Sequence, residues 1–198
     1  MKSCIELPEG YSEYYRLDMQ KQKKPMLIIN ITAIVIMVLL YLVGTVFHPI
    51  SEFFSSKQYF TRFIFMAVGY ILYIILHELV HGITMKYYGA KKIKYGFTGM
   101  YAFAGCQEYF AKKPYIVIAF APIVAWGVVL AVLCAVVPAS WFWVVYFIQI
   151  GNIAGAAGDA YVSFVFAKMP KDILIKDGGV SMTVYSKEKS DIVSGKEE

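Results

Sequence analysis

The sequence contains little charge and little cysteine. Of its 198 residues, 17% are charged and 59% are hydrophobic, whereas soluble domains have about 25% and about 45–50%. Disordered chains are poor in apolar residues and rich in charge, so intrinsic disorder is excluded for most of the chain. Three cysteines are too few for a small secreted domain held together by disulfides. The composition instead predicts a membrane protein.

A net charge of +5 could attract nucleic acid. In an apolar chain, however, such an excess also arises from lysines retained on the cytoplasmic side of a bilayer. We therefore expect the lipid bilayer as a partner and no nucleic acid.

Four apolar stretches are each long enough to cross a hydrocarbon core of about 30 Å, which takes roughly 20 helical residues. The first and third contain no Asp, Glu, Lys, Arg or His. The stretches are 26–47, 63–85, 115–137 and 141–167. The sequence predicts an all-α integral membrane protein whose domain 26–167 has four transmembrane helices.

Lysine and arginine predict the orientation of these helices. Seventeen of the 19 lie before residue 26, between 86 and 113, or after 167, and the other two lie in the connection 47–63. The positive-inside rule then places the tails 1–25 and 168–198 in the cytoplasm, together with the loop between helices two and three. We expect a multi-pass protein of a cell membrane, the bacterial cytoplasmic membrane, with both termini inside.

Two segments outside the helices favour extended structure. Residues 92–109 are rich in glycine and aromatic residues and lack a helical period, which predicts a small extended or β loop. Residues 173–185 read as two short apolar strands around Asp-Gly-Gly, which predicts a hairpin. The charged end that follows predicts partial disorder of the C-terminal tail.

The ionisable side chains inside the predicted spans carry the chemistry, because such groups are costly in a membrane and usually functional. Apart from cysteine and tyrosine, they are His77, Glu78, His81 and Asp159. The first three form H-E-x-x-H, in which two histidines four apart on a helix can bind one Zn²⁺ and the glutamate can act as general base. A buried polar network or haem ligation is the alternative.

Asp159 is the expected third zinc ligand. Helices two and four run in the same direction, and a rise of 1.5 Å per residue places His81 and Asp159 each about 27 Å below the start of its span. The alternative is that Asp159 caps or breaks the last helix. Full retention of zinc without it would direct the search to Cys106 or Asn152; a lone cysteine has no ligand spacing, and a free thiol is its simpler interpretation.

The stretch before Asp159 predicts close helix packing, because Gly151 and Gly155 are four apart and lack side chains. Asn152 lies on the same helix face as Asp159, about 10.5 Å away. It could position a substrate carbonyl, or it could be an interhelical polar contact. Pro122, inside the third span, is expected to bend that helix and free the carbonyl of Ile118.

The chain resembles a family of bacterial multi-pass membrane proteins described as putative zincin peptidases, and more distantly the site-2 proteases. The matching segments are HELVHG at 77–82, YGFTG at 95–99, AFAP at 119–122 and GNIAGAAGD at 151–159. The resemblance implies a zinc peptidase with His77, His81 and Asp159 as ligands and Glu78 as base. The glycine-rich context of Asp159 departs from the site-2 proteases, and no PDZ-like module fits this length.

The sequence therefore predicts a membrane-embedded zinc metallopeptidase with one Zn²⁺ per chain, which acts on a peptide or membrane-protein substrate. Buried His, Glu and Asp also form ion relays, so a metal or proton transporter is the first alternative. The clustering of the ionisable groups near one depth favours the enzyme. A catalytically silent, zincin-like protein that binds a partner is the second alternative.

Overall fold

The computed structural model describes residues 3–19, 21–54 and 57–187. The chain forms two compact units. We call residues 1–27, 78–121 and 159–198 the sheet unit, and residues 28–77 and 122–158 the helical unit. The charged C-terminal end that was expected to be disordered, residues 188–198, lies outside the described residues.

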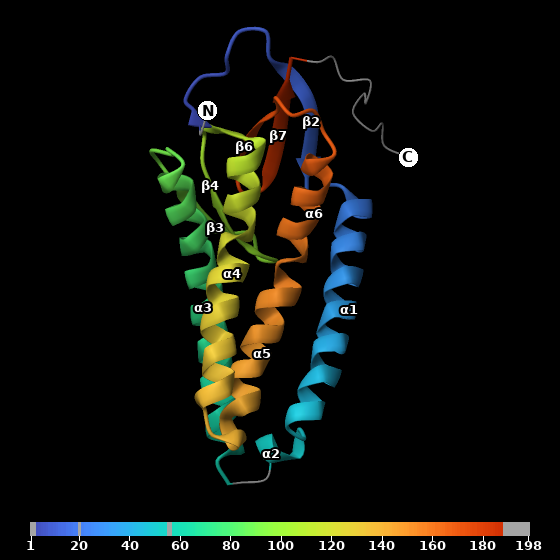
Figure 1. The fold of residues 1–198 in the computed structure, drawn as a ribbon, viewed down its shortest axis with the longest axis vertical. Helices are drawn as coiled ribbons and strands as arrows, with labels where there is room; N and C mark the ends of the chain where they lie inside the picture. Colours follow the sequence, from blue (N-terminus) through green and yellow to red (C-terminus); the bar gives the residue numbers. More distant parts are fainter. Residues whose placement is uncertain (1–2, 20, 55–56, 188–198) are drawn as a thin grey trace. The chain divides into compact units, whose positions relative to one another are not determined.

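Six helices account for most of the described chain (Figure 1). They are α1 (Lys23–Phe47), α2 (Ser51–Phe54), α3 (Tyr59–Tyr87), α4 (Lys112–Val136), α5 (Ala139–Gly155) and α6 (Ala157–Ala167). Four segments are long and apolar enough to cross a membrane, namely α1, α3, α4 and α5 with α6. The bounds of these helical segments differ from the four predicted ranges by a few residues at most.

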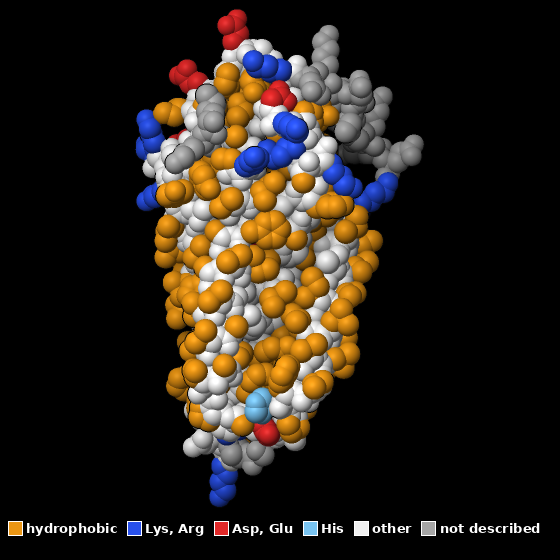
Figure 2. Space-filling view, in the orientation of Figure 1, with side chains coloured by type: hydrophobic (Ala, Val, Ile, Leu, Met, Phe, Trp, Pro, Cys, Tyr) orange, Lys and Arg blue, Asp and Glu red, His pale blue; other side chains and the backbone are white. Residues whose placement is uncertain are grey.

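The surface of the helices is apolar. On the face shown in Figure 2, hydrophobic side chains cover the helices, and most Lys, Arg, Asp and Glu side chains lie away from this apolar surface. Helix α1 exposes apolar side chains along its length, including Ile28, Ile31, Val35, Leu39, Leu42 and Val46. An apolar surface of this extent is unfavourable in water and is suited to contact with lipid.

The fourth predicted span is two helices rather than one. Helix α5 ends at Gly155, Ala156 is non-helical, and α6 begins at Ala157. Asp159 therefore lies in the first turn of α6. An acidic side chain is favourable there, because the helix dipole places partial positive charge at a helix N-terminus.

The sheet unit contains a five-stranded antiparallel sheet. Its strands are β1 (Ser3–Cys4), β2 (Ser12–Asp18), β5 (Tyr109–Ala111), β6 (Leu174–Asp177) and β7 (Ser181–Ser186). The order is β1-β5-β6-β7-β2, and β6, β7 and β2 lie beside one another in Figure 1. The hairpin predicted near the C-terminus is β6 and β7.

This sheet corrects the expectation of an all-α fold in which residues 1–25 are only a tail. Leu17 of β2, Ile175 of β6 and Val184 of β7 are completely buried in the core of the sheet unit. Strand β2 pairs with β7 from the other end of the chain, and this pairing places Leu17 in the core. The N-terminal segment is thus part of the folded unit.

The segment 92–109 also contains β structure. Strands β3 (Lys94–Phe97) and β4 (Ala102–Gly105) form an antiparallel pair, and the turn between them contains Gly99 with a positive φ of 91°. Glycine adopts this conformation without a steric cost. The predicted extended loop is therefore a hairpin.

The helical unit has two apolar clusters. One contains Phe53 of α2 with Phe142 and Trp143 of α5. The other contains Tyr73 of α3, Leu130 of α4 and Ile148 of α5. Aromatic side chains dominate the first cluster, and their rings bury large apolar areas. These contacts fix the part of α3 that leads into the H-E-x-x-H motif.

Candidate functional site

The H-E-x-x-H motif lies on the C-terminal half of α3. The boundary between the two units falls between His77 and Glu78, but α3 continues through it from Tyr59 to Tyr87. His77 and His81 are one turn apart, so their side chains leave the same helix face. Both histidines are more than nine-tenths buried.

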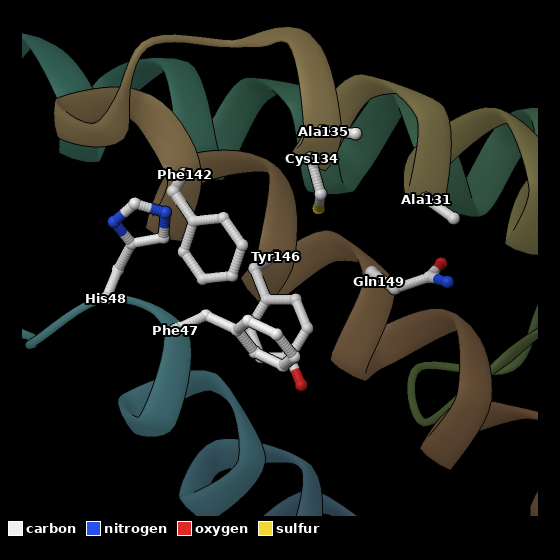
Figure 3. Close-up of a pocket in the computed structure, with 8 residues that line it drawn as sticks. All are labelled: Phe47, His48, Ala131, Cys134, Ala135, Phe142, Tyr146 and Gln149. Carbon is white, nitrogen blue, oxygen red and sulfur yellow. The ribbon is translucent and has the colours of Figure 1, made fainter.

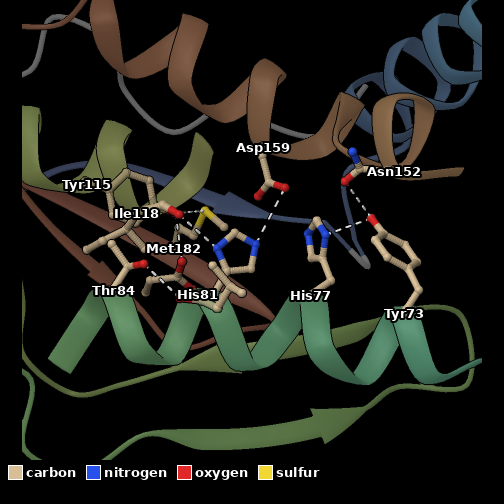
Figure 4. A network of polar contacts seen from close by, with 11 residues as sticks. Tyr73, His77, His81, Thr84, Tyr115, Ile118, Asn152, Asp159 and Met182 are labelled. Atoms are coloured by element: carbon tan, nitrogen blue, oxygen red, sulfur yellow. Dashed lines mark hydrogen bonds and ion pairs between the residues drawn. The ribbon is translucent and has the colours of Figure 1, made fainter. Parts of the chain in front are cut away.

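His81 is held from both sides of its ring within the sheet unit (Figure 4). Its Nε2 lies 3.7 Å from Oδ2 of Asp159, and its Nδ1 lies 3.0 Å from the backbone carbonyl of Ile118. A carbonyl oxygen can only accept a hydrogen bond, so Nδ1 is the donor. The lone pair of a neutral His81 ring is then on Nε2 and faces Asp159.

His77 is held by a corresponding network within the helical unit. Nδ1 of His77 lies 2.8 Å from the hydroxyl of Tyr73, which donates to Oδ1 of Asn152 at 3.1 Å. Because the Tyr73 proton is directed to Asn152, His77 Nδ1–H is the donor to Tyr73. The lone pair of a neutral His77 ring is also on Nε2.

His77, His81 and Asp159 form a group that could hold a metal. Each offers one ligand atom, and these atoms lie within 4.8 Å of one another. Two ligands about 2.1 Å from a tetrahedral zinc are about 3.4 Å apart, so the 3.7 Å between His81 and Asp159 is close to that spacing. Two Nε2 lone pairs and a carboxylate are donors that zinc accepts. The residues present therefore fit zinc.

The structure brings His81 and Asp159 close together, and Asp159 also lies just after a helix break. Asp159 thus lies where a ligand beside His81 would lie, and it also lies where the last helix is interrupted. The break at Ala156 starts a new helix, and the side chain in its first turn reaches His81.

Glu78 faces a tyrosine of the β3–β4 hairpin. A Cβ on Gly82, one turn after Glu78, would overlap the hydroxyl of Tyr95. Burial raises the pKa of Tyr95, and the negative charge of Glu78 raises it further. The phenol therefore stays protonated near neutral pH and can donate a hydrogen bond beside Glu78.

A second carboxyl group approaches the site in the sheet unit. The hydroxyl of Tyr115 donates to Oδ2 of Asp177 at 2.7 Å, and the N–H of Gly179 donates to Oδ1 at 2.8 Å. Burial raises the pKa of Asp177, while these hydrogen bonds and the nearby His81 oppose the shift. Asp177 is not among the site residues predicted from the sequence, where its local signal is its position in the Asp-Gly-Gly turn.

Cys106 was one of the two residues considered as a third zinc ligand in place of Asp159. It lies outside the metal-binding group of the described residues. Its side chain is 1% exposed, and burial raises its pKa to about 12. The thiolate is the form of cysteine that binds metals, and it is scarce near neutral pH for such a group. The structure supports the interpretation of Cys106 as a buried thiol.

Asn152 is completely buried, and its amide is engaged in the helical unit. Nδ2 donates to the carbonyl of Ile123 and to the side chain of Gln149, both at 3.3 Å. Together with Tyr73, these contacts favour the interhelical alternative, while a role in positioning substrate stays a prediction.

Only one of the two predicted glycine contacts is found. A Cβ on Gly151 would overlap the ring of Tyr70, as close helix packing requires. A Cβ on Gly155 would meet no atom of the described residues within 4 Å. The prediction for Gly155 is wrong.

Tyr73 and the carbonyl of Ile118, which contact the two histidines, were not predicted as site groups. Tyr73 precedes His77 by four residues, so its place on the same helix face was available from the sequence. Ile118 had a weaker signal, the proline four residues later.

A pocket elsewhere in the helical unit contains none of the predicted site residues (Figure 3). Its volume is about 490 Å³. Its walls are Phe47, His48, Ala131, Cys134, Ala135, Phe142, Tyr146 and Gln149. The lining is largely apolar, and His48 is its only histidine. The H-E-x-x-H group therefore remains the candidate site.

Comparisons with known proteins identify the family of the chain. A protein of Pyrococcus woesei named "Uncharacterized 24.7 kDa protein in gap 5'region" is 32% identical over 123 residues, which are 60% of this chain and 53% of that protein. The chain thus spans about half the length of this curated relative. No solved structure matches. The model of the family described as "Putative zincin peptidase" matches residues 70–174, which include the H-E-x-x-H motif, the β3–β4 hairpin and Asp159. The chain belongs to this zincin peptidase family.

Proposed function

We propose that the protein is a membrane-embedded zinc metallopeptidase that hydrolyses peptide bonds in or near the bilayer. His77, His81 and Asp159 hold one zinc ion per chain, and Glu78 is the general base. The carrying observation is the group of two buried histidines and one aspartate within 4.8 Å, on helices long and apolar enough to cross a membrane. The family match supports the same reaction class.

The residues around the metal group divide the work of hydrolysis. Zinc, when bound, supplies a Lewis acid that acidifies water and polarises the scissile carbonyl. Glu78 takes a proton from the attacking water as its oxygen bonds to the carbonyl carbon. When the C–N bond breaks, Glu78 returns the proton to the leaving amine. Tyr73 and Ile118 keep the histidine rings oriented, as hydrogen bonds to metal-binding histidines commonly do.

The substrate of the proposed reaction is an extended segment of a peptide or membrane protein. Helical carbonyls are hydrogen-bonded and shielded, so a membrane helix must unwind before it is cut. Strand β3 pairs with β4 on one side only among the described strands, and its Tyr95 lies beside Glu78. An unwound substrate could add to this free edge as a further strand.

The experiment that tests this function is cleavage of a mixture of synthetic peptides, read by mass spectrometry. The purified protein in detergent is expected to cut peptides, to lose the activity with 1,10-phenanthroline, and to regain it with added Zn²⁺. Zinc acts here on the reaction itself, so removal must abolish cleavage. A zinc-loaded protein that cuts nothing but moves Zn²⁺ or protons across liposomes would support the transporter instead. Zinc binding with neither activity would support the silent scaffold.

We also propose that both termini and the β3–β4 hairpin lie in the cytoplasm, because 17 of 19 Lys and Arg residues lie on that side of the spans. A cysteine introduced at Lys57, between α2 and α3, is expected to react with an impermeant maleimide in intact cells. A cysteine at Lys94 is expected to react only after permeabilisation. Labelling of the cysteine at position 94 but not of the one at position 57 in intact cells would contradict the proposed orientation. It would place the candidate site near the outer face.

A further inference from the structure

A proline lies in the interior of α4 and is fully buried. Pro122 is the eleventh residue of this 25-residue helix. Proline has no backbone N–H, so the carbonyl four residues earlier loses its helical hydrogen-bond partner. That carbonyl belongs to Ile118.

The carbonyl of Ile118 is the group that accepts the hydrogen bond of His81. The distance from Nδ1 is 3.0 Å, and the Ile118 side chain is 1% exposed. A buried carbonyl without a partner is costly, and a buried histidine needs a partner for its N–H. The N–H of His81 therefore takes the place of the helical donor that the Ile118 carbonyl lacks.

We propose that Pro122 is a positioning residue for the metal site. By removing one N–H from α4, it keeps the carbonyl of Ile118 available to His81. The hydrogen bond then holds the proton of His81 on Nδ1 and leaves Nε2 toward Asp159. This proposal rests on the proposed function for the role of zinc, but the link between Pro122 and His81 can be measured without metal.

An ordinary residue at 122 would place its N–H beside the Ile118 carbonyl, as in every regular turn of an α-helix. The carbonyl would then be shared or withdrawn, and His81 would no longer be held in one tautomer and one ring orientation. Changes in the partners of metal-binding histidines weaken metal binding by about 10- to 100-fold. We expect a loss of this size in Pro122→Ala.

The matched control is Pro114→Ala, in the same helix. Pro114 is the third residue of α4, within the first turn, where an N–H has no intrahelical acceptor. The N–H that Pro114→Ala introduces therefore changes no hydrogen bond to a carbonyl of α4. A second test variant replaces Pro122 by lactic acid, the hydroxy analogue of alanine, through nonsense suppression. This residue lacks both the proline ring and the N–H.

Two readouts are measured on each purified protein. The dissociation constant for Zn²⁺ comes from competition with a chromophoric chelator. The tautomer of His81 in the metal-free protein comes from ¹⁵N NMR with labelled histidine, at a pH at which the ring is neutral; the chain has three histidines, assigned with His48→Gln and His77→Gln. We expect Pro122→Ala to bind zinc 10- to 100-fold more weakly and to show a mixture of tautomers, and the other two variants to resemble wild type.

Several outcomes would overturn the proposal. Wild-type zinc affinity and an unchanged tautomer in Pro122→Ala would show that the carbonyl is not controlled by Pro122. Equal losses in the alanine and lactic acid variants would assign the effect to packing of the proline ring. If wild type binds no zinc, the proposed function fails, and the tautomer measurement still decides whether Pro122 positions His81.

Discussion

Alanine at Asp159 is expected to remove most of the zinc from the purified protein. Wild type should carry about one zinc per chain, measured by inductively coupled plasma mass spectrometry, as a site with three protein ligands does. The Asp159 carboxylate supplies the only negative charge in the proposed ligand set, beside Nε2 of His81. Without it, two histidines on one helix remain, and affinity should fall by more than the 10- to 100-fold seen for changes outside the ligands.

His77→Ala and His81→Ala are expected to lose zinc to a similar degree, because each leaves only two of the three ligands. Cys106→Ser is the matched control, since Cys106 is buried in the sheet unit but lies outside the metal group of the described residues. It should retain the zinc content of wild type. Full zinc content in Asp159→Ala would contradict the proposed ligand set and return Cys106 and Asn152 to consideration.

The helices could be predicted from the sequence because a membrane span leaves a strong local signal. About 20 consecutive apolar residues suffice, and the ranges 26–47 and 115–137 agree closely with α1 and α4. The break at Ala156 enters the sequence analysis only through the alternative for Asp159, because alanine and glycine on both sides are compatible with a continuous helix in membrane proteins.

The five-stranded sheet could not be assembled from the sequence. Its strands are two to seven residues long, and each is a weak local pattern. The burial of Leu17 depends on pairing between β2 and β7, whose residues are more than 160 positions apart in the chain. Nothing in the segment 12–18 alone indicates that partner, so the segment was assigned to a tail.

The candidate site divides in the same way. His77, Glu78 and His81 are visible as a spacing within one helix, and Asp159 as a rare acid at a matching depth. The hydrogen bonds that orient the two rings come from a tyrosine hydroxyl and a main-chain carbonyl. A carbonyl is present at every residue, so only the fold shows which one meets His81.

Glu78→Gln is expected to leave zinc bound and to reduce peptide cleavage by about 10² to 10⁴-fold, the usual contribution of a general base. Glutamine keeps the size and hydrogen-bonding capacity of the side chain but cannot take the proton from water. Glu78 lies outside the group of three proposed ligands, so zinc content should not change. The measurements are zinc per chain and the rate of cleavage of the peptides that wild type cuts.

Glu52→Gln is the matched control, the same substitution in α2, where Glu52 contacts His48 at 3.1 Å. It should cleave at the wild-type rate. The Glu78→Gln protein should also hold uncut peptide in a stable complex, because recognition is intact while proton transfer is blocked. Loss of zinc in Glu78→Gln would make Glu78 part of the metal site, and cleavage at the wild-type rate would exclude it as the base. A transporter does not hydrolyse peptides, so it has no residue whose substitution stops cleavage while zinc stays bound. Retained zinc with lost cleavage in Glu78→Gln would therefore identify the protein as an enzyme.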